Sequence, residues 1–165
     1  MKKFNEYKKL FFIGVAGSGM SALAQYTAAS GITTNGSDRF FKNGTYNEIR
    51  EKLEAAGIHC FPQDGSGLTQ DTDAVIVSTA IEETVQEVAL ARKFKIPVLK
   101  RSDLLALVAE SKKTIAIAGT SGKSTTTGML FHILSATGLD PGIISGAGLI
   151  SLIEQGKIGN AFLGN

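Results

Sequence analysis

The sequence of 165 residues has little of what marks several large classes of protein. Its single cysteine, Cys60, excludes an internal disulfide framework and is typical of a reducing cytoplasm. Its three prolines argue against a fibrous or disordered chain. A formal net charge of +2, without long runs of like charge, does not favour nucleic acid as a partner. No apolar run is long enough to span a bilayer, so we expect a cytoplasmic protein without membrane insertion.

The N-terminus has one feature of an exported protein, because lysines precede the apolar run 10–13 as in a secretory signal peptide. Glycines at positions 14, 17 and 19 interrupt the apolar stretch. Their spacing is better explained by a turn between a strand and a helix.

Short apolar runs alternate with helix-like segments, which is typical of βαβ units around a parallel sheet. The strands that we expect are residues 10–13, 32–35, 58–61, 73–78, 98–99 and 114–118. The helices that we expect are residues 18–29, a helix from a Thr45–Glu48 capping box to 56, a helix with Val85, Val88 and Ala89 on one face, residues 103–109 capped by Ser102, and residues 123–135. The polar residues 110–113 fit a linker. The pattern predicts an α/β fold, a Rossmann-like parallel sheet with flanking helices, followed by a second strand–turn–helix unit.

The clearest motif lies in that second unit, between an apolar strand and a helix. It consists of Gly119, Thr120, Ser121, Gly122, Lys123, Ser124 and Thr125. Glycines let successive amide hydrogens point at phosphate oxygens, and the helix start adds its positive dipole end. Lys123 would reach the β- and γ-phosphates, and a neighbouring hydroxyl would bind Mg²⁺. The usual first glycine is replaced by Ile117, so the motif predicts a shortened ATP-binding loop rather than an ordinary turn with a solvated lysine.

A first loop, Gly14-Val15-Ala16-Gly17-Ser18-Gly19, also follows a strand and opens a helix. Asp38 stands about where a ribose-binding acid is expected, and the alternative is a solvated loop acid. Alone, this pattern favours a dinucleotide fold such as an NAD-binding module. A lone glycine pattern is only weakly specific for NAD, and indicates more generally a diphosphate at a helix N-terminus.

Together the two loops resemble the Mur ligase family, the ATP-dependent ligases of bacterial peptidoglycan synthesis. The resemblance rests on residues 12–21, 36–38, 78–81, 96–98, 101–105 and 119–126, which occur in that family's order and cover essentially the whole chain. It implies that residues 1–110 form a UDP-binding domain. Residues 111–165 would then begin a central P-loop ATPase domain.

The resemblance also implies roles for individual residues. The UDP part of UDP-N-acetylmuramate would meet Gly14, Ala16, Gly17, Ser18, Gly19, Met20, Ser37, Asp38, Ser78 and Thr79. ATP would bind at residues 119–125, with Lys123 as the catalytic residue that stabilises the transferring phosphoryl group. Ser124 or Thr125 would hold Mg²⁺. ATP would phosphorylate the muramoyl carboxylate, and the amine of L-alanine, or of a recycled peptide, would attack the acyl phosphate.

The sequence departs from the family pattern in two ways. Ser121 stands where the alanine-adding and tripeptide-recycling members usually have histidine. The sequence also stops within the ATPase domain, so we expect this chain alone to be inactive. Two other interpretations stay open at this point, an NAD-binding module and a non-catalytic fragment that binds a UDP-sugar.

Overall fold

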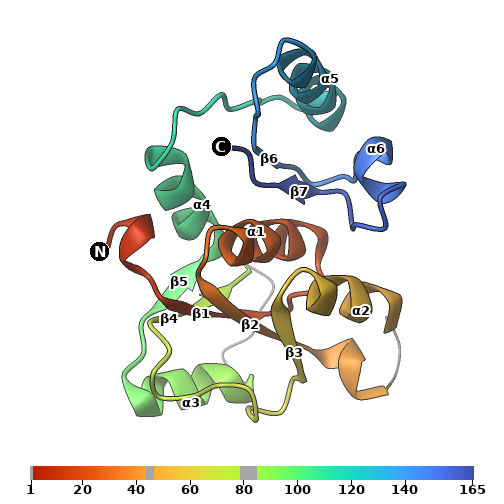
Figure 1. Cartoon of the computed structure of the whole chain (residues 1–165). Coiled ribbons are helices and arrows are strands. Elements are labelled where there is room, and N and C mark those ends of the chain that lie inside the picture. Colours follow the sequence, from red (N-terminus) through yellow and green to blue (C-terminus); the bar gives the residue numbers. More distant parts are fainter. Residues whose placement is uncertain (1, 44–46, 79–84) are drawn as a thin grey trace.

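A computed structural model describes residues 2–43, 47–78 and 85–165 (Figure 1). Its centre is a five-stranded parallel sheet with the order β3-β2-β1-β4-β5. The strands are β1 (Lys9–Ile13), β2 (Thr33–Asp38), β3 (Ile58–Pro62), β4 (Ala74–Val77) and β5 (Val98–Lys100). The helices around this sheet are α1 (Ser18–Ala29), α2 (Asn47–Ala55), α3 (Gln86–Phe94) and α4 (Arg101–Glu110), with short 3-10 turns at Phe4–Glu6 and Arg39–Asn43. The predicted α/β fold is confirmed.

Helices cover both faces of the sheet (Figure 1). Helices α1, α2 and α4 pack on one face, where their buried side chains join Leu10 and Phe12 of β1 in one core cluster. Helix α3 lies on the other face, with Phe11 and Ile13 of β1 in a second cluster. All four of these β1 residues are at most 1% exposed. The continuous apolar run of β1 follows from this arrangement, because a central parallel strand buries both of its faces.

Strand β2 is longer than predicted and more polar than β1. The expected strand ended at residue 35, because Gly36-Ser37-Asp38 has the composition of a turn. In the structure these three residues continue the strand: all three pair with β3, and Gly36 and Ser37 also pair with β1. Gly36 is needed there for space, since a Cβ at this position would lie 2.7 Å from Cβ of the fully buried Val15.

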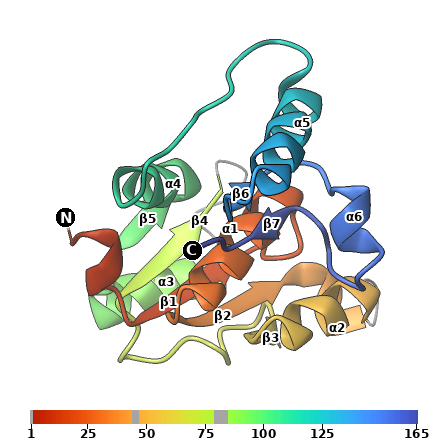
Figure 2. The ribbon, with the colours of Figure 1, turned by 45° about the horizontal axis from the view of Figure 1, so that its top comes forward.

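The C-terminal part of the chain folds back over α1. It consists of α5 (Lys123–Ala136), β6 (Ile143–Ile144), α6 (Ile150–Ile153) and β7 (Ala161–Phe162), and β6 and β7 pair in an antiparallel arrangement. Both views place β7 beside α1 (Figure 2). The rings of Phe131 in α5 and Phe162 in β7 meet edge to face at 6.1 Å between centroids.

Two predictions about secondary structure were wrong. Residues 114–118 are exposed except for the half-buried Ile117, and they belong to neither sheet. A strand needs a partner, and no described strand lies alongside them. Helix α4 begins at Arg101, not after a Ser102 cap. Asp103 caps the N-terminus of the helix, because its Oδ2 accepts a hydrogen bond from the Lys100 amide at 3.2 Å.

The predicted apolar face of α3 is partly wrong too. Val88 is buried as expected, but Ala89 is exposed. The buried positions beside Val88 are Glu87 and Ala91. The Thr45 capping box lies outside the described residues. Among the helices of the described ranges, none has the length and apolar character to cross a membrane.

The close contact between Gly36 and Val15 leads to a stability prediction. Gly36→Ala would force a methyl group against a buried, χ1-restricted side chain, and we expect the free energy of unfolding to fall by about 1–3 kcal/mol. Chemical denaturation measures this change. Gly146→Ala is the control, because an added Cβ there meets no atom within 4 Å. Unchanged stability of Gly36→Ala, or no partial recovery in the double variant with Val15→Ala, would contradict the packing argument.

Cys60 provides a chemical prediction. Its burial, with the nearby negative charge of Glu54, raises the pKa of the thiol to about 12. The thiolate is the reactive species, so the native chain should not react with a disulfide reagent at pH 8. The chain unfolded in guanidinium should react at once, and absorbance of the released thiolate measures both rates. Equal rates for native and unfolded chain would show that Cys60 is accessible.

Candidate functional site

The sequence-predicted residues of the first site that the structure describes lie at one edge of the sheet. In a parallel sheet all carboxyl ends lie at the same edge, and ligands bind there where the strand order reverses. The chain runs from β1 outward to β2 and β3, then returns to β4 on the other side of β1. The reversal therefore lies between β1, which is followed by the loop 14–19, and β4, which is followed by Ser78.

The loop itself is held by strand β2. Gly14 adopts φ +76°, a conformation that favours glycine, and turns the chain out of the sheet. The amides of Gly14 and Val15 both donate to the carbonyl oxygen of Ser37, over 2.8 and 3.0 Å. The Gly17 amide donates to the Gly14 carbonyl at 3.2 Å. These hydrogen bonds within the chain thus fix the path of the loop from β1 into α1.

Asp38 completes this support. Its side chain is buried, with Oδ2 accepting from the Ala16 amide at 3.0 Å and Oδ1 accepting from the Phe40 amide at 3.1 Å. A carboxylate that accepts backbone amides is well suited to hold a turn. In this structure Asp38 shapes the loop, and a contact with ribose or uracil stays a prediction.

The first turn of α1 offers the amides that a ligand can use. The first amides of a helix lack acceptors within the helix and attract anions. Residues 14–17 already use their amides as described above, and α1 begins at Ser18. Among residues 2–43, 47–78 and 85–165, no group accepts from the Ser18 or Gly19 amide.

Arg101 is a candidate site residue that the sequence patterns did not single out. Its Nη1 lies 3.1 Å from the position that a Cβ on Gly19 would occupy, so the guanidinium packs directly on this glycine. The described part of the chain supplies no carboxylate in an ion pair with it. A signal was present, since Arg101 follows β5 and therefore stands at the same sheet edge as the loop after β1.

Other predicted residues of this site lie in different surroundings. Met20 is buried in the core cluster under α1, so its side chain serves packing. Ser37 pairs with Ile13 and is fully buried, and strand alternation places its side chain on the opposite face of the sheet from Asp38. Its contribution to the loop is the backbone carbonyl. Ser78 is half-buried at the end of β4, and Thr79 lies outside the described residues.

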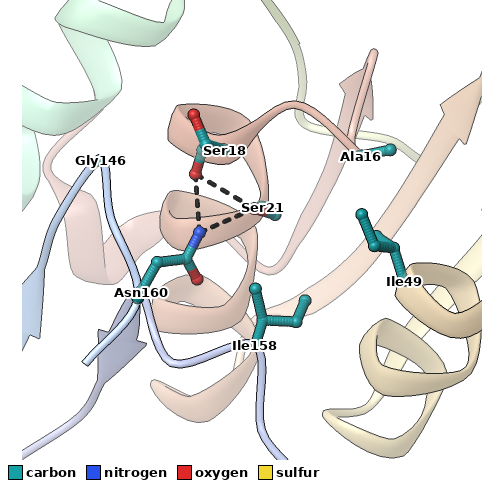
Figure 3. Close-up of a pocket in the computed structure, with 8 residues that line it drawn as sticks. Ala16, Ser18, Ser21, Ile49, Gly146, Ile158 and Asn160 are labelled. Atoms are coloured by element: carbon teal, nitrogen blue, oxygen red, sulfur yellow. Dashed lines mark hydrogen bonds between the residues drawn. The ribbon is translucent and has the colours of Figure 1, made fainter. Parts of the chain in front are cut away.

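A cavity of about 170 Å³ lies between this loop and the C-terminal part of the chain (Figure 3). Its lining residues come from the loop, from α1 and α2, and from the C-terminal part, and are Ala16, Ser18, Ser21, Ile49, Gly146, Gly148, Ile158 and Asn160. Sequence reasoning did not find the second wall, because residues 146–160 carry no recognisable motif. Their participation follows only from the way the chain folds back over α1.

The second loop forms a separate, exposed group. Gly122 has φ +74° and directly precedes α5. The ammonium group of Lys123 folds back and donates to the carbonyl oxygens of Gly119 and Thr120, at 2.6 and 3.1 Å. Ser124 and Thr125 are exposed in the first turn of α5. Lysine, glycine amides and hydroxyls suit a phosphate chain, but the described residues contain no cluster of His, Cys, Asp or Glu that could hold a metal ion.

Known proteins resemble this chain over nearly its full length. A family model described as "Mur ligase family, catalytic domain" matches residues 9–113. The UDP-N-acetylmuramate–L-alanine ligase of Syntrophomonas wolfei is 38% identical over 162 residues, which cover 98% of this chain and 33% of that protein. The Burkholderia cenocepacia ligase of the same name is 36% identical over 92% of this chain and 32% of its own length.

Two solved structures share the fold. The UDP-N-acetylmuramate-alanine ligase of Thermotoga maritima aligns with a TM-score of 0.83 and 30% identity, over 96% of this chain and 35% of that one. A murein peptide ligase from Psychrobacter arcticus aligns with a TM-score of 0.81 and 27% identity, over 96% of this chain and 34% of that one. The chain spans about a third of the length of these relatives. The family model covers more than half of the chain, and the chain therefore belongs to the Mur ligase family.

Proposed function

We propose that this chain supplies the UDP-N-acetylmuramate site of an ATP-dependent ligase that joins L-alanine to that substrate. The observation that carries the proposal is the combination of the Ser18 and Gly19 amides with Arg101 at the point where the strand order reverses. Two amides at a helix start and one guanidinium suit a diphosphate. The N-acetylmuramate part of the substrate and the added L-alanine are inferred from the names of the relatives.

Residues 119–125 would hold the triphosphate of ATP in the same proposal. ATP would phosphorylate the muramoyl carboxylate with release of ADP, and the amine of L-alanine would displace the phosphate to form the amide. Lys123 would leave the Gly119 and Thr120 carbonyls to neutralise the transferring phosphoryl group. Ser124 or Thr125 would bind Mg²⁺, which needs further oxygen ligands from the substrate or from elsewhere in the enzyme. The cytoplasm, where Cys60 stays reduced, is the expected location.

A tripeptide-recycling ligase is the second candidate, favoured by the likeness to the murein peptide ligase. Both ligases would use the same nucleotide site, because they would differ in the amine that is added. An NAD-binding module agrees less well with the structure. The acid that should bind a ribose, Asp38, is buried and engaged by the Ala16 and Phe40 amides.

Calorimetric titration of the purified chain with UDP-N-acetylmuramate and with NADH tests the proposal. We expect binding of the UDP-sugar and of UDP itself, with no heat from NADH. The diphosphate is common to all three ligands, so the uracil end accounts for the difference. NADH binding in the absence of UDP binding would exclude the ligase interpretation.

The role of Arg101 has its own test. Arg101→Met removes the guanidinium while keeping a long side chain, and we expect the Kd for UDP to rise about 10-fold, the effect of losing one charged hydrogen bond. Lys100→Met removes the same charge from the neighbouring residue and serves as the control. If both variants weaken UDP binding equally, only the net charge matters and Arg101 does not contact the diphosphate.

A further inference from the structure

The side chain of Asn160 ties the C-terminal part of the chain to the first turn of α1 (Figure 3). It is only 3% exposed. Its Nδ2 donates to the Ser18 carbonyl at 2.8 Å and to Ser21 Oγ at 2.9 Å, while its Oδ1 accepts from Gln25 Nε2 at 2.8 Å. Both amide hydrogens and the carbonyl oxygen are thus engaged. Any shift of the segment would leave buried polar groups unpaired, so the network defines one docking geometry.

One of these hydrogen bonds reaches the peptide unit that faces the proposed ligand. The carbonyl of Ser18 and the N–H of Gly19 belong to the same peptide, which is planar and trans. The two groups point in opposite directions. A donor that fixes the Ser18 oxygen therefore also fixes the direction of the Gly19 N–H, beside which the Arg101 guanidinium lies.

The same hydrogen bond changes the electronic character of the peptide. A donor at a carbonyl oxygen polarises the peptide and makes its N–H a stronger donor, and hydrogen bonds in such a chain strengthen one another. The effect is larger where water is excluded, and this hydrogen bond is part-buried, with Asn160 itself only 3% exposed. A polarised Gly19 N–H would bind a phosphate oxygen more tightly.

The backbone of Asn160 is fixed by hydrogen bonds within the C-terminal part of the chain. Its backbone carbonyl accepts from the Ser145 amide at 2.8 Å, and the neighbouring Gly159 carbonyl accepts from the Leu149 amide at 2.9 Å. These contacts lie within residues 145–160 and do not involve α1. The position of the Asn160 side chain is therefore set by residues 145–160 and not by α1, the helix that it contacts.

We propose that Asn160 is a positioning residue for the nucleotide site, which orients and polarises the Ser18–Gly19 peptide for the diphosphate. Docking of residues 143–162 on α1 and binding of the diphosphate then favour each other, because the coupling between two such events is reciprocal. This inference rests on the proposed function of the first loop, and it assigns a role in that site to a residue 142 positions away from Ser18 in the sequence.

Calorimetric titration with UDP of the full 165-residue chain tests this role. Asn160→Leu keeps the size of the side chain and removes both donors without adding charge, and we expect the Kd for UDP to rise about 10-fold. Phe162→Leu loosens the same strand at its contact with Phe131 and leaves Asn160 in place. We expect its affinity to stay close to that of the wild type, while thermal melts report the folding of both variants.

Two results would overturn the proposal. One is wild-type affinity in Asn160→Leu, and the other is an equal loss in Phe162→Leu, which would indicate general loosening. A wild-type chain that binds no UDP would contradict the proposed function itself, and this inference with it, so the two failures are distinguishable.

A measurement on the wild-type chain does not depend on how the variants fold. In a ¹H–¹⁵N NMR titration with UDP, the Gly19 amide and the Asn160 Nδ2 signals should move together along one binding curve. Asn160 side-chain signals that stay unshifted while UDP binds would show that the two groups are not coupled.

Discussion

Three consecutive amides of the loop after β1 are bound by two consecutive residues of β2. The amides of Gly14 and Val15 donate to the Ser37 carbonyl, and the Ala16 amide donates to the Asp38 carboxylate. This constraint determines where the chain turns and where α1 begins. It also determines which amides remain for a ligand, because those of Ser18 and Gly19 have no acceptor among the described residues. The position of the proposed diphosphate site therefore follows from the hydrogen bonds between the loop amides and the end of β2.

The C-terminal part of the chain completes one side of this site. Its cavity wall and the Asn160 network meet the same first turn of α1 that the β2 residues place. Gly19 has Arg101 beside it, and the carbonyl of the same peptide is held by Asn160. The two parts of the chain are thus joined at the peptide that the proposed ligand would use.

Much of the fold could be predicted from local sequence patterns. The buried run of β1, the glycine loop and helix α1 follow from the alternation of apolar and helix-like segments. The two phosphate-type loops indicated the family. The missing strand at 114–118 shows the limit of this reasoning. Apolar composition predicts a strand, but a strand forms only beside a partner, and the described sheets have none there.

The candidate site was predicted in part, for a related reason. The loop 14–19 and Asp38 are close in sequence to the strands that carry them, and their placement was foreseeable. The side chains of Ser37 and Met20 are buried because of the face of β2 or α1 that each occupies. The residue types alone do not indicate that face. Arg101 follows β5, but its place beside the loop depends on the strand order. Asn160 reaches the loop only through the return of the chain over α1, a tertiary feature without a local signal.

A crystal structure of the chain with bound UDP would show whether the diphosphate lies at the proposed site. The account predicts that the diphosphate contacts the Ser18 and Gly19 amides and the Arg101 guanidinium, while the amides of residues 14–16 keep their bonds to Ser37 and Asp38. A diphosphate bound elsewhere, or one that displaces those β2 contacts, would contradict it.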